Sequence, residues 1–335
     1  MPVQSIANRS SISKTARASG FRAVRVAAAA LVAGLALAPG AASAQFVNVL
    51  TGGTSGVYYP LGVAISKVIG EKVPGTRPSV QATKASVENL NLIQQGKGEV
   101  AFTLADSLAD GAAGKEEAGF KAPLSKVQAL GGIYSNYIQI VASKDSGIRT
   151  IADLKGKRLS VGAPKSGTEL NARAILNAAG LKYDDLGKVE YLPFAESVEL
   201  MKNRQLDATL QSAGLGVASI KDLANSVPIV VVEVPGAVID KIGAPYLKAT
   251  IPASTYEGQG ADVATAAVPN FLVTRADLKE DEVYAITKAV YENLPELAAA
   301  HAAAKSIKLE NAMKGSPVPF HPGAVRFFKE KGVNP

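Results

Sequence analysis

The chain has 335 residues, of which 36 are lysine or arginine and 29 are aspartate or glutamate, and it contains no cysteine. Without cysteine, thiol catalysis, thiolate zinc sites, iron–sulfur clusters and disulfides are all excluded. The formal net charge of +7 would favour nucleic acid or a membrane surface as a partner. Most of that charge, however, lies at the beginning of the chain.

The first 44 residues have the pattern of a secretory leader. Five basic residues precede an apolar run over residues 26–38, which is followed by a Pro-Gly break and an Ala-Ser-Ala motif that ends at Ala44. We expect a signal peptide over residues 1–44, cleaved after Ala44. The mature chain then has 31 basic and 29 acidic residues, a net charge of +2, and no nucleic-acid partner is expected. The periplasm is the expected destination, although full secretion would use the same leader.

The remaining 291 residues alternate short apolar strands with helical stretches, which is typical of an α/β fold with largely parallel sheets. Two α/β lobes are the simplest interpretation. In chain order, the expected elements are a strand from Phe46, a helix from Tyr58 or Tyr59, a strand over 79–83, a helix capped by Ser86, strands over 100–104 and 158–161, a helix over 170–179, a strand over 189–192, a helix over 196–203, and strands over 208–211 and 229–234.

Two further strands are expected to cross between the lobes and to form a hinge. The first begins at Ile138 and leaves lobe one, and the second begins at Pro269 and returns. The helix-rich remainder from Glu280, in which Pro295 is expected to break a helix, would pack on lobe one. The predicted domains are lobe one, 45–139 plus 272–335, and lobe two, 140–271.

Two glycine- and hydroxyl-containing turns carry the clearest functional pattern. GGTSG follows the first strand at residues 52–56, and SGTE follows a lobe-two strand at residues 166–169. Each precedes a helix, so free backbone N–H groups and the helix dipole favour an anion there. A purely structural helix cap explains one such turn equally well. Two of them, one in each lobe at the carboxyl end of a strand, predict a shared crevice that binds an anion.

The sequence lacks the motifs of several other kinds of functional site. Neither turn continues into the GK[ST] of a phosphate-binding loop, and no GxGxxG follows the first strand. The two histidines, His301 and His321, are far apart in sequence, and there is no GxSxG elbow for a nucleophilic triad. Asp106 and Asp110 are best interpreted as capping or solvated surface residues. We expect no catalytic residue, no metal and no cofactor.

Tyrosines give a second indication of a ligand. Tyr58 and Tyr59 open a helix beside the first turn, and Tyr134 and Tyr137 stand just before the first crossing. A phenol offers an apolar wall with one polar tip, which suits a small polar solute. At least two of the four are expected simply to pack in the core.

The motifs TGGTSGVYYPLG, QATKASVENLNLIQQGKGEVAFTLAD, IADLKGKRLSVGAPKSGTELNAR and PVPFHPGAVRFFKEKG run in this order over nearly the whole mature chain. Together they resemble the TAXI family of solute receptors for TRAP transporters. The resemblance implies a class II periplasmic binding protein fold, with two α/β lobes joined by a two-strand hinge. It also implies a monomeric receptor that delivers a small organic anion, such as glutamate, 2-oxoglutarate or a related carboxylate, to sodium-coupled TRAP membrane permease subunits.

Carried over residue by residue, the resemblance predicts ligand contacts in four short segments. The predicted ligand-binding residues are Gly53, Thr54, Ser55, Tyr58, Thr83, Ser86, Ser166, Gly167, Thr168, Gln211 and Ser212. Lys84 and Lys165 depart from the small or neutral residues expected at their positions, and each is either an extra cation for the ligand or a solvated charge at the rim. Arg173 is the nearest nominee for a carboxylate clamp, against the alternative that it pairs with a neighbouring acid.

Two other functions stay open on the sequence alone. One is an enzyme on the same scaffold, for which Asp106, Glu88 or Glu169 would have to supply the acid or base. The other is a component that presents its ligand to a membrane-bound signalling protein.

Overall fold

The computed structural model describes residues 45–334, so the expected signal peptide lies outside the described residues. The described strands form one hydrogen-bonded sheet. The strands are β1 (Gln45–Leu50), β2 (Thr76–Gln81), β3 (Val100–Leu104), β4 (Val127–Ser143), β5 (Arg158–Ser160), β6 (Lys188–Glu190), β7 (Ala208–Ala213), β8 (Ile229–Val232), β9 (Leu247–Ile251) and β10 (Val263–Arg275).

Helices and short 3-10 turns connect these strands. The α-helices are α2 (Tyr58–Lys72), α3 (Ser86–Gln94), α4 (Ala105–Ala113), α5 (Gly167–Ala178), α6 (Phe194–Lys202), α7 (Ala218–Ser226), α8 (Gly236–Ile242), α9 (Glu280–Tyr291), α10 (Leu294–Ala300) and α11 (Pro322–Glu330). The 3-10 helices are η2 (Glu116–Ala118), η3 (Lys144–Ser146), η4 (Ile151–Leu154), η5 (Tyr183–Asp185), η6 (Ala302–Ser306) and η7 (Leu309–Asn311). No helix in this described part is both long enough and apolar enough to cross a membrane.

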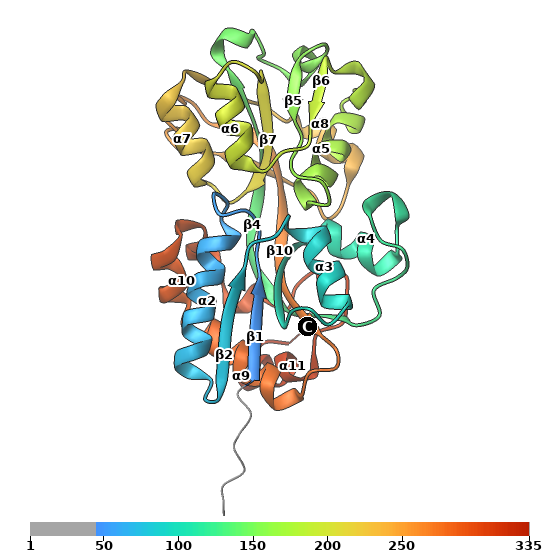
Figure 1. Ribbon diagram of the computed structural model, residues 1–335, viewed down its shortest axis with the longest axis vertical. Helices are drawn as coiled ribbons and strands as arrows, with labels where there is room; N and C mark the ends of the chain where they lie inside the picture. The colour runs from blue at the N-terminus through green and yellow to red at the C-terminus, as the bar shows by residue number, and fades with distance from the viewer. Residues whose placement is uncertain (1–44, 335) are drawn as a thin grey trace, which may run out of the picture. The chain divides into compact units, whose positions relative to one another are not determined.

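The strand order divides the sheet into two lobes. It runs β2-β1-β3-β10-β4-β7-β5-β6, with β8 beside β4 and β9 beside β10. The group β2-β1-β3 is parallel, as is the group β7-β5-β6, while β10 and β4 pair antiparallel with their neighbours between the two groups. Figure 1 shows β4 and β10 running through both groups. The predicted α/β fold with two lobes and a two-strand connection is confirmed.

The two crossing strands are longer than the sequence indicated. β4 has 17 residues and β10 has 13. β10 pairs with β3 over residues 270–273 and with β9 over residues 263–267, so the strand changes lobes in the short stretch between them. Its register against β4 shifts between Pro269 and Phe271, which is where a proline is tolerated because the ladder is already interrupted. The domain limits at 139/140 and 271/272 stay a prediction.

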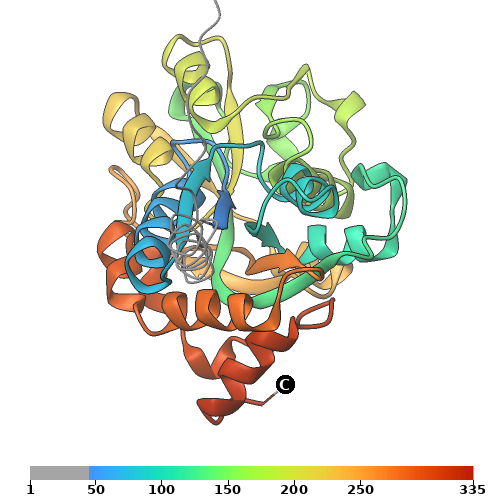
Figure 2. The same cartoon turned by 60° about the horizontal axis from the view of Figure 1, so that its bottom comes forward.

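The C-terminal helices return to lobe one, as expected. α9 and α10 contact α2, and α11 packs on α9; Figure 2, with this end of the molecule forward, shows α9 and α11 against each other. The expectation that Pro295 breaks a helix is confirmed: α9 ends at Tyr291, and a separate helix, α10, begins at Leu294. Pro295 lies in the first turn of α10, where the missing N–H has no helical partner to lose.

Two local expectations need correction. Ser86 is the first residue of α3 and does not cap it: the N-cap is Ala85, at φ 72°, and no side chain caps this helix end. The Ser86 Oγ instead accepts a hydrogen bond from the Leu104 N–H at 3.2 Å, which fastens α3 to the end of β3. α5 begins at Gly167 rather than near residue 170, because Ser166 caps it by accepting a hydrogen bond from the Glu169 N–H.

Candidate functional site

The first predicted turn opens a helix end that faces inward. The loop after β1 closes with a hydrogen bond from the Gly56 N–H to the Gly53 carbonyl at 3.0 Å, and α2 begins at Tyr58 as expected. Its N-cap, Val57, offers no side-chain bond, and the first turn of α2 carries no acidic residue. The N-terminus of α2 therefore keeps free N–H donors and an uncompensated positive dipole end.

Two further helix ends approach the same place. α3 starts behind Thr83, whose hydroxyl donates to the Thr51 carbonyl at 2.9 Å and accepts from the Ala85 N–H at 2.9 Å. α5 starts behind Ser166 in the other lobe. Because β1, β2 and β5 all end toward the boundary between the lobes, the helices that follow them, α2, α3 and α5, present their N-termini there.

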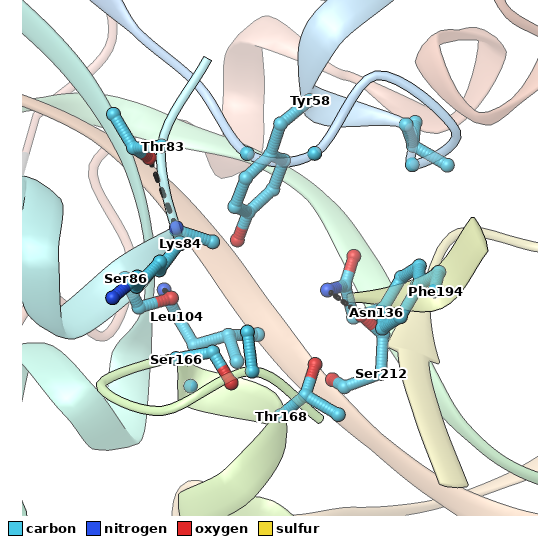
Figure 3. Close-up of a pocket in the computed structure, with 18 of the residues that line it drawn as sticks. Tyr58, Thr83, Lys84, Ser86, Leu104, Asn136, Ser166, Thr168, Phe194 and Ser212 are labelled. Carbon is cyan, nitrogen blue, oxygen red and sulfur yellow. Dashed lines mark hydrogen bonds between the residues drawn. The ribbon is translucent and has the colours of Figure 1, made fainter. Parts of the chain in front are cut away.

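A cavity of about 120 Å³ lies where these helix ends meet. It has room for a small organic molecule rather than a single water. The structure places eight of the eleven sequence-predicted residues on its wall: Gly53, Tyr58, Thr83, Ser86, Ser166, Gly167, Thr168 and Ser212. Figure 3 shows the Tyr58 hydroxyl pointing into the cavity from lobe one, and the hydroxyls of Thr168 and Ser212 from lobe two.

Three predicted residues do not line this cavity. Thr54 and Ser55 lie in the first turn but outside the wall. Gln211 is fully buried in β7, and its Oε1 accepts a hydrogen bond from the Ser219 hydroxyl at 2.6 Å. Successive side chains of a strand face opposite sides, so Ser212 can reach the cavity only because Gln211 points away from it.

A network of two buried amides supports the cavity wall, which Asn136 lines and behind which Asn270 lies. The Asn270 amide donates to the Tyr134 carbonyl at 3.0 Å and to the Asn136 Oδ1 at 2.9 Å, and the Asn136 amide donates to the Ser212 carbonyl at 2.8 Å. The Tyr58 hydroxyl donates to the Asn270 Oδ1. This chain of hydrogen bonds runs from α2 through both crossing strands to β7. It fixes the Tyr58 phenol, and sequence reasoning missed both asparagines, although an amide inside an apolar strand is an unusual residue choice.

Two buried hydroxyls on the cavity wall have no partner among the described residues. These are the Oη of Tyr134, whose side chain is 2% exposed, and the Oγ of Ser212, which is 5% exposed. An unsatisfied buried hydroxyl costs about 1–3 kcal/mol. Burial also raises the pKa values of Tyr58 and Tyr134 far above the ordinary phenol value, so both stay neutral O–H groups. A ligand that accepts hydrogen bonds would satisfy the hydroxyls of Tyr134 and Ser212.

The rest of the wall is apolar. It is formed by Val57, Ala85, Leu104, Ala163, Pro193, Phe194 and Ala213. Phe194, at the start of α6, approaches Gly56 of the opposite lobe, where a Cβ would lie 3.8 Å from its ring. Sequence reasoning missed Phe194. It could have been found as a residue at a helix start after a strand, which is the same pattern that identified Tyr58.

The cationic candidates lie at or beyond the edge of the site. Lys84 lines the cavity with an exposed side chain, while Lys165 lies outside it, at φ 61°. Arg173 pairs with Glu169 of its own helix at 2.8 Å, which is the alternative that the sequence left open. Glu169 also accepts from the Tyr183 hydroxyl at 3.0 Å. Arg173 therefore does not act as a clamp inside this cavity.

The sequence interpretation of Asp106 as a capping or solvated residue is wrong. Its side chain is 8% exposed, and it accepts hydrogen bonds from Tyr246 and Asn171 of the other lobe. Burial raises the pKa of Asp106 from 3.8 to about 6. Asp110, by contrast, is paired with Lys115 at the surface at 2.6 Å.

The two histidines cap local structure: His301 accepts a hydrogen bond from the Ala303 N–H, and His321 accepts one from the Gly323 N–H.

None of the residues that line the cavity is an aspartate, a glutamate or a histidine. Across residues 45–334, no group of three or more His, Asp or Glu side chains is placed to hold a metal ion. The arrangement of amide groups, neutral hydroxyls and apolar walls can bind and desolvate a small molecule, and it brings no acid–base pair to it.

Fold and site together define a two-lobe α/β protein of the class II periplasmic binding protein fold. Residues 49–332 match the NMT1-like family, and the chain belongs to that family. Among solved structures, the chain is similar to a protein of Bordetella bronchiseptica RB50, with 18% identity and a TM-score of 0.50, over 87% of this chain and 90% of that one.

Two sulfonate-binding proteins match less closely. One is the periplasmic aliphatic sulphonate binding protein SsuA from Escherichia coli, with 15% identity and a TM-score of 0.42, over 76% of this chain and 78% of that one. The other is the alkanesulfonate-binding protein SsuA from Xanthomonas axonopodis pv. citri bound to MOPS, with 14% identity and a TM-score of 0.46, over 86% and 91% of the two chains. At these identities the similarity concerns the fold.

Proposed function

We propose that this protein is a solute receptor that captures one small organic anion between its lobes. The observation that carries the proposal is the convergence of three helix N-termini, from both lobes, on one cavity whose wall holds two hydroxyls without a partner among residues 45–334. Helix N-termini attract anions, and the buried hydroxyls supply donors that no group in this part of the chain uses. Closure would desolvate the anion, so the closed state is favoured most when it is occupied.

The anion that fits best is a small carboxylate. The cavity offers neutral donors on a largely apolar wall, and the one lysine on that wall is exposed. Such a wall binds one charged end of a ligand and packs against its carbon chain. It supplies no carboxylate for an α-ammonium group, which makes a 2-oxo acid a better candidate than an amino acid such as glutamate. Sulfonates, which the two SsuA proteins bind by name, carry the same charge and belong in the same screen.

We further propose that the receptor delivers the bound anion to a membrane permease, and this part of the proposal rests on the resemblance of the sequence motifs to TAXI receptors. By that resemblance, the receptor acts in the periplasm after removal of residues 1–44, and its partner is a sodium-coupled TRAP permease. The ligand contacts predicted from the sequence are part of the same proposal. Uptake of the bound solute driven by ATP instead of a sodium gradient would contradict the choice of permease without affecting the capture of the anion.

An enzyme on the same scaffold is disfavoured by the positions of its candidate groups. Glu88, Asp106 and Glu169 are all outside the cavity wall, and Glu169 is held by Arg173 and Tyr183. A signalling receptor would need the same ligand site, so only its partner distinguishes it from a transport receptor.

A thermal-shift screen tests the proposal directly. The mature chain is heated with mono- and dicarboxylates, 2-oxo acids, amino acids and alkanesulfonates, with sodium chloride at equal ionic strength as the control. A ligand at about 100 times its Kd stabilises the folded state by about 2.7 kcal/mol, which raises the Tm by roughly 5 °C for a chain of this size. At least one carboxylate should give such a shift. A shift with sulfonates alone would overturn the carboxylate assignment, and no shift with any anion would overturn the receptor function.

A further inference from the structure

A cluster of buried polar side chains joins the two lobes away from the ligand cavity. Asp106 lies in the first turn of α4 in lobe one, Asn171 in α5 and Tyr246 in the loop before β9, both in lobe two. The Tyr246 hydroxyl donates to the Asp106 Oδ2 at 2.7 Å, and the Asn171 amide donates to the same oxygen at 2.5 Å. All three side chains are at least nine-tenths buried, and none of them lines the cavity.

Further hydrogen bonds link the members of this cluster, while the Asn171 Oδ1 is buried with no hydrogen-bond partner among residues 45–334. The Asn171 amide also donates to the Tyr246 Oη at 2.7 Å, and the Ser107 N–H donates to the Asp106 Oδ1 at 2.7 Å. Asp106 therefore accepts hydrogen bonds on both carboxylate oxygens, one on Oδ1 from its own helix and two on Oδ2 from the other lobe. These contacts between lobes break when the lobes separate, because their partners lie on different lobes.

Neighbouring contacts cross the cleft on the same side. The Glu88 N–H of α3 donates to the Lys165 carbonyl at 3.2 Å, and the Arg173 guanidinium donates to the Glu117 carbonyl at 2.9 Å. The lobes therefore touch each other directly along the α3–α4–α5 side, with no ligand between them. The contacts of Lys165 and Arg173 are exposed and exchange readily with water, whereas the Asp106 cluster is buried and its partners must be paired.

We propose that Asp106, Asn171 and Tyr246 form an interlobe latch, which sets the balance between open and closed lobes independently of the contacts with the ligand. This inference rests on the cycle of opening and closing in the proposed function. A latch that holds some of the empty protein closed raises the fraction of chains with a formed cavity, and the apparent affinity for a ligand rises with that fraction. Opening must also break the latch contacts, so these contacts slow the release of the ligand in addition to the contacts that the ligand itself makes.

The test measures lobe separation with no ligand present. Because the chain has no cysteine, Lys121→Cys and Lys241→Cys introduce two unique labelling sites, which are exposed and lie one in each lobe. Spin labels on this pair report the distance distribution between the lobes. Tyr246→Phe removes one hydroxyl at constant shape and leaves the buried Asp106 oxygen with fewer donors. The closed-to-open ratio of the empty protein should fall about tenfold.

Two further variants secure the interpretation. Asn171→Ala should shift the distribution in the same direction, and the double variant with Tyr246→Phe should fall short of the sum of the two effects, because both residues act on one carboxylate. Tyr284→Phe is the matched control, since its hydroxyl contacts Glu330 within lobe one, and it should leave the distribution unchanged. An identical distribution in the parent protein and in Tyr246→Phe overturns the latch. Since no ligand is used, the latch can stand or fall separately from the receptor function.

Discussion

The Tyr134 hydroxyl is placed to bind a ligand rather than to stabilise the fold. Its hydroxyl is buried on the cavity wall and has no partner among the described residues, although neighbouring buried groups such as Asn136 and Asn270 are paired. An unpartnered hydroxyl lowers stability in the empty protein and gains its hydrogen bond only when a ligand arrives.

The variant Tyr134→Phe separates these two roles. It should leave the Tm of the empty protein unchanged or raised, since no hydrogen bond is lost. It should also weaken anion binding about tenfold to a hundredfold, because hydrogen bonds to charged groups contribute about 1.5–3 kcal/mol. Calorimetric titration with the anion found by thermal shift measures the affinity. Tyr284→Phe is the control for the loss of a phenol outside the cleft, and equal affinity in the Tyr134 variant would contradict the assignment.

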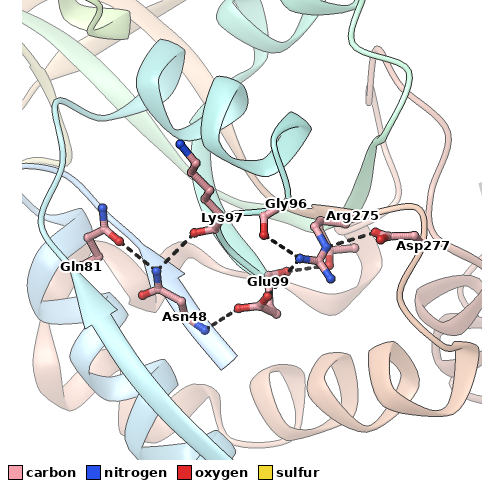
Figure 4. Close-up of polar contacts among 8 residues, drawn as sticks. Asn48, Gln81, Gly96, Lys97, Glu99, Arg275 and Asp277 are labelled. Atoms are coloured by element: carbon pink, nitrogen blue, oxygen red, sulfur yellow. Dashed lines mark hydrogen bonds and ion pairs between the residues drawn. The ribbon is translucent and has the colours of Figure 1, made fainter. Parts of the chain in front are cut away.

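At the scale of elements, the fixed ends of the crossing strands decide where the hinge can bend. Arg275, at the end of β10, donates to the Gly96 carbonyl at 2.9 Å and pairs with Glu99 at 3.2 Å, and Glu99 accepts from the Asn48 N–H at 2.8 Å. Figure 4 shows this network tying β10 to the beginning of β3 and to β1. Because this end of β10 is anchored in lobe one, bending is expected nearer the register shift at Pro269.

The N-terminus of α5 must come very close to lobe one. A Cβ on Gly167 would lie 2.6 Å from a methyl carbon of Leu104, 2.7 Å from the Ser86 Oγ and 2.9 Å from the Ser107 Oγ. All three neighbours belong to the opposite lobe, so this glycine is needed for the approach of two elements and not for the helix itself.

The substitution Gly167→Ala is therefore expected to oppose closure without harming the fold. Overpacking costs about 1–3 kcal/mol, which corresponds to about a fivefold to 150-fold loss of anion affinity. The Tm of the empty protein should hold or rise if the lobes can open, since alanine favours the helix. Small-angle scattering with saturating anion should show a larger radius of gyration than in the parent protein. Gly260→Ala, where a Cβ meets nothing within 4 Å, is the control; a compact, tight-binding Gly167 variant would refute the close approach.

At the scale of the whole molecule, the latch makes lobe closure depend on pH. In the closed state burial raises the pKa of Asp106 to about 6; the negative charge of Asp110 adds to this rise, and the hydrogen bonds from Tyr246 and Ser107 oppose it. The Tyr58 phenol of α2 also interacts electrostatically with Asp106. In the open state the hydrated carboxyl returns toward 3.8. The closed state thus binds more protons between these two values. Its extra stability is fully present below about pH 4 and is lost as the pH rises through about 6.

The closed-to-open ratio of the empty protein should therefore increase about tenfold between about pH 7.5 and about pH 5. The label pair at positions 121 and 241 measures it. Asp106→Asn removes the titrating group and should flatten this profile, while the control Asp110→Asn, at a surface ion pair, should keep it. A profile that survives in Asp106→Asn would assign the pH response to another group.

Local pattern was sufficient for much of the fold. β3 covers the five residues that the sequence predicted, all of them buried, and α2 begins at Tyr58, because an apolar strand and a helix start have signatures within a few residues. β2 ends at Gln81 rather than at 83, since Thr83 is needed to hold the turn into α3. Such a boundary depends on a tertiary hydrogen bond to Thr51, which no local pattern contains.

The sequence by itself determined the alternation of strands and helices, the pair of glycine turns and eight of the residues on the cavity wall, because each follows from spacing and residue type along the chain. Only the tertiary structure decided what Asp106, Asn136 and Phe194 do. Their partners lie between 65 and 140 positions away along the chain. Burial and pairing across that separation set the charge of a carboxyl and the shape of a cavity, and they exist only once the two lobes have come together.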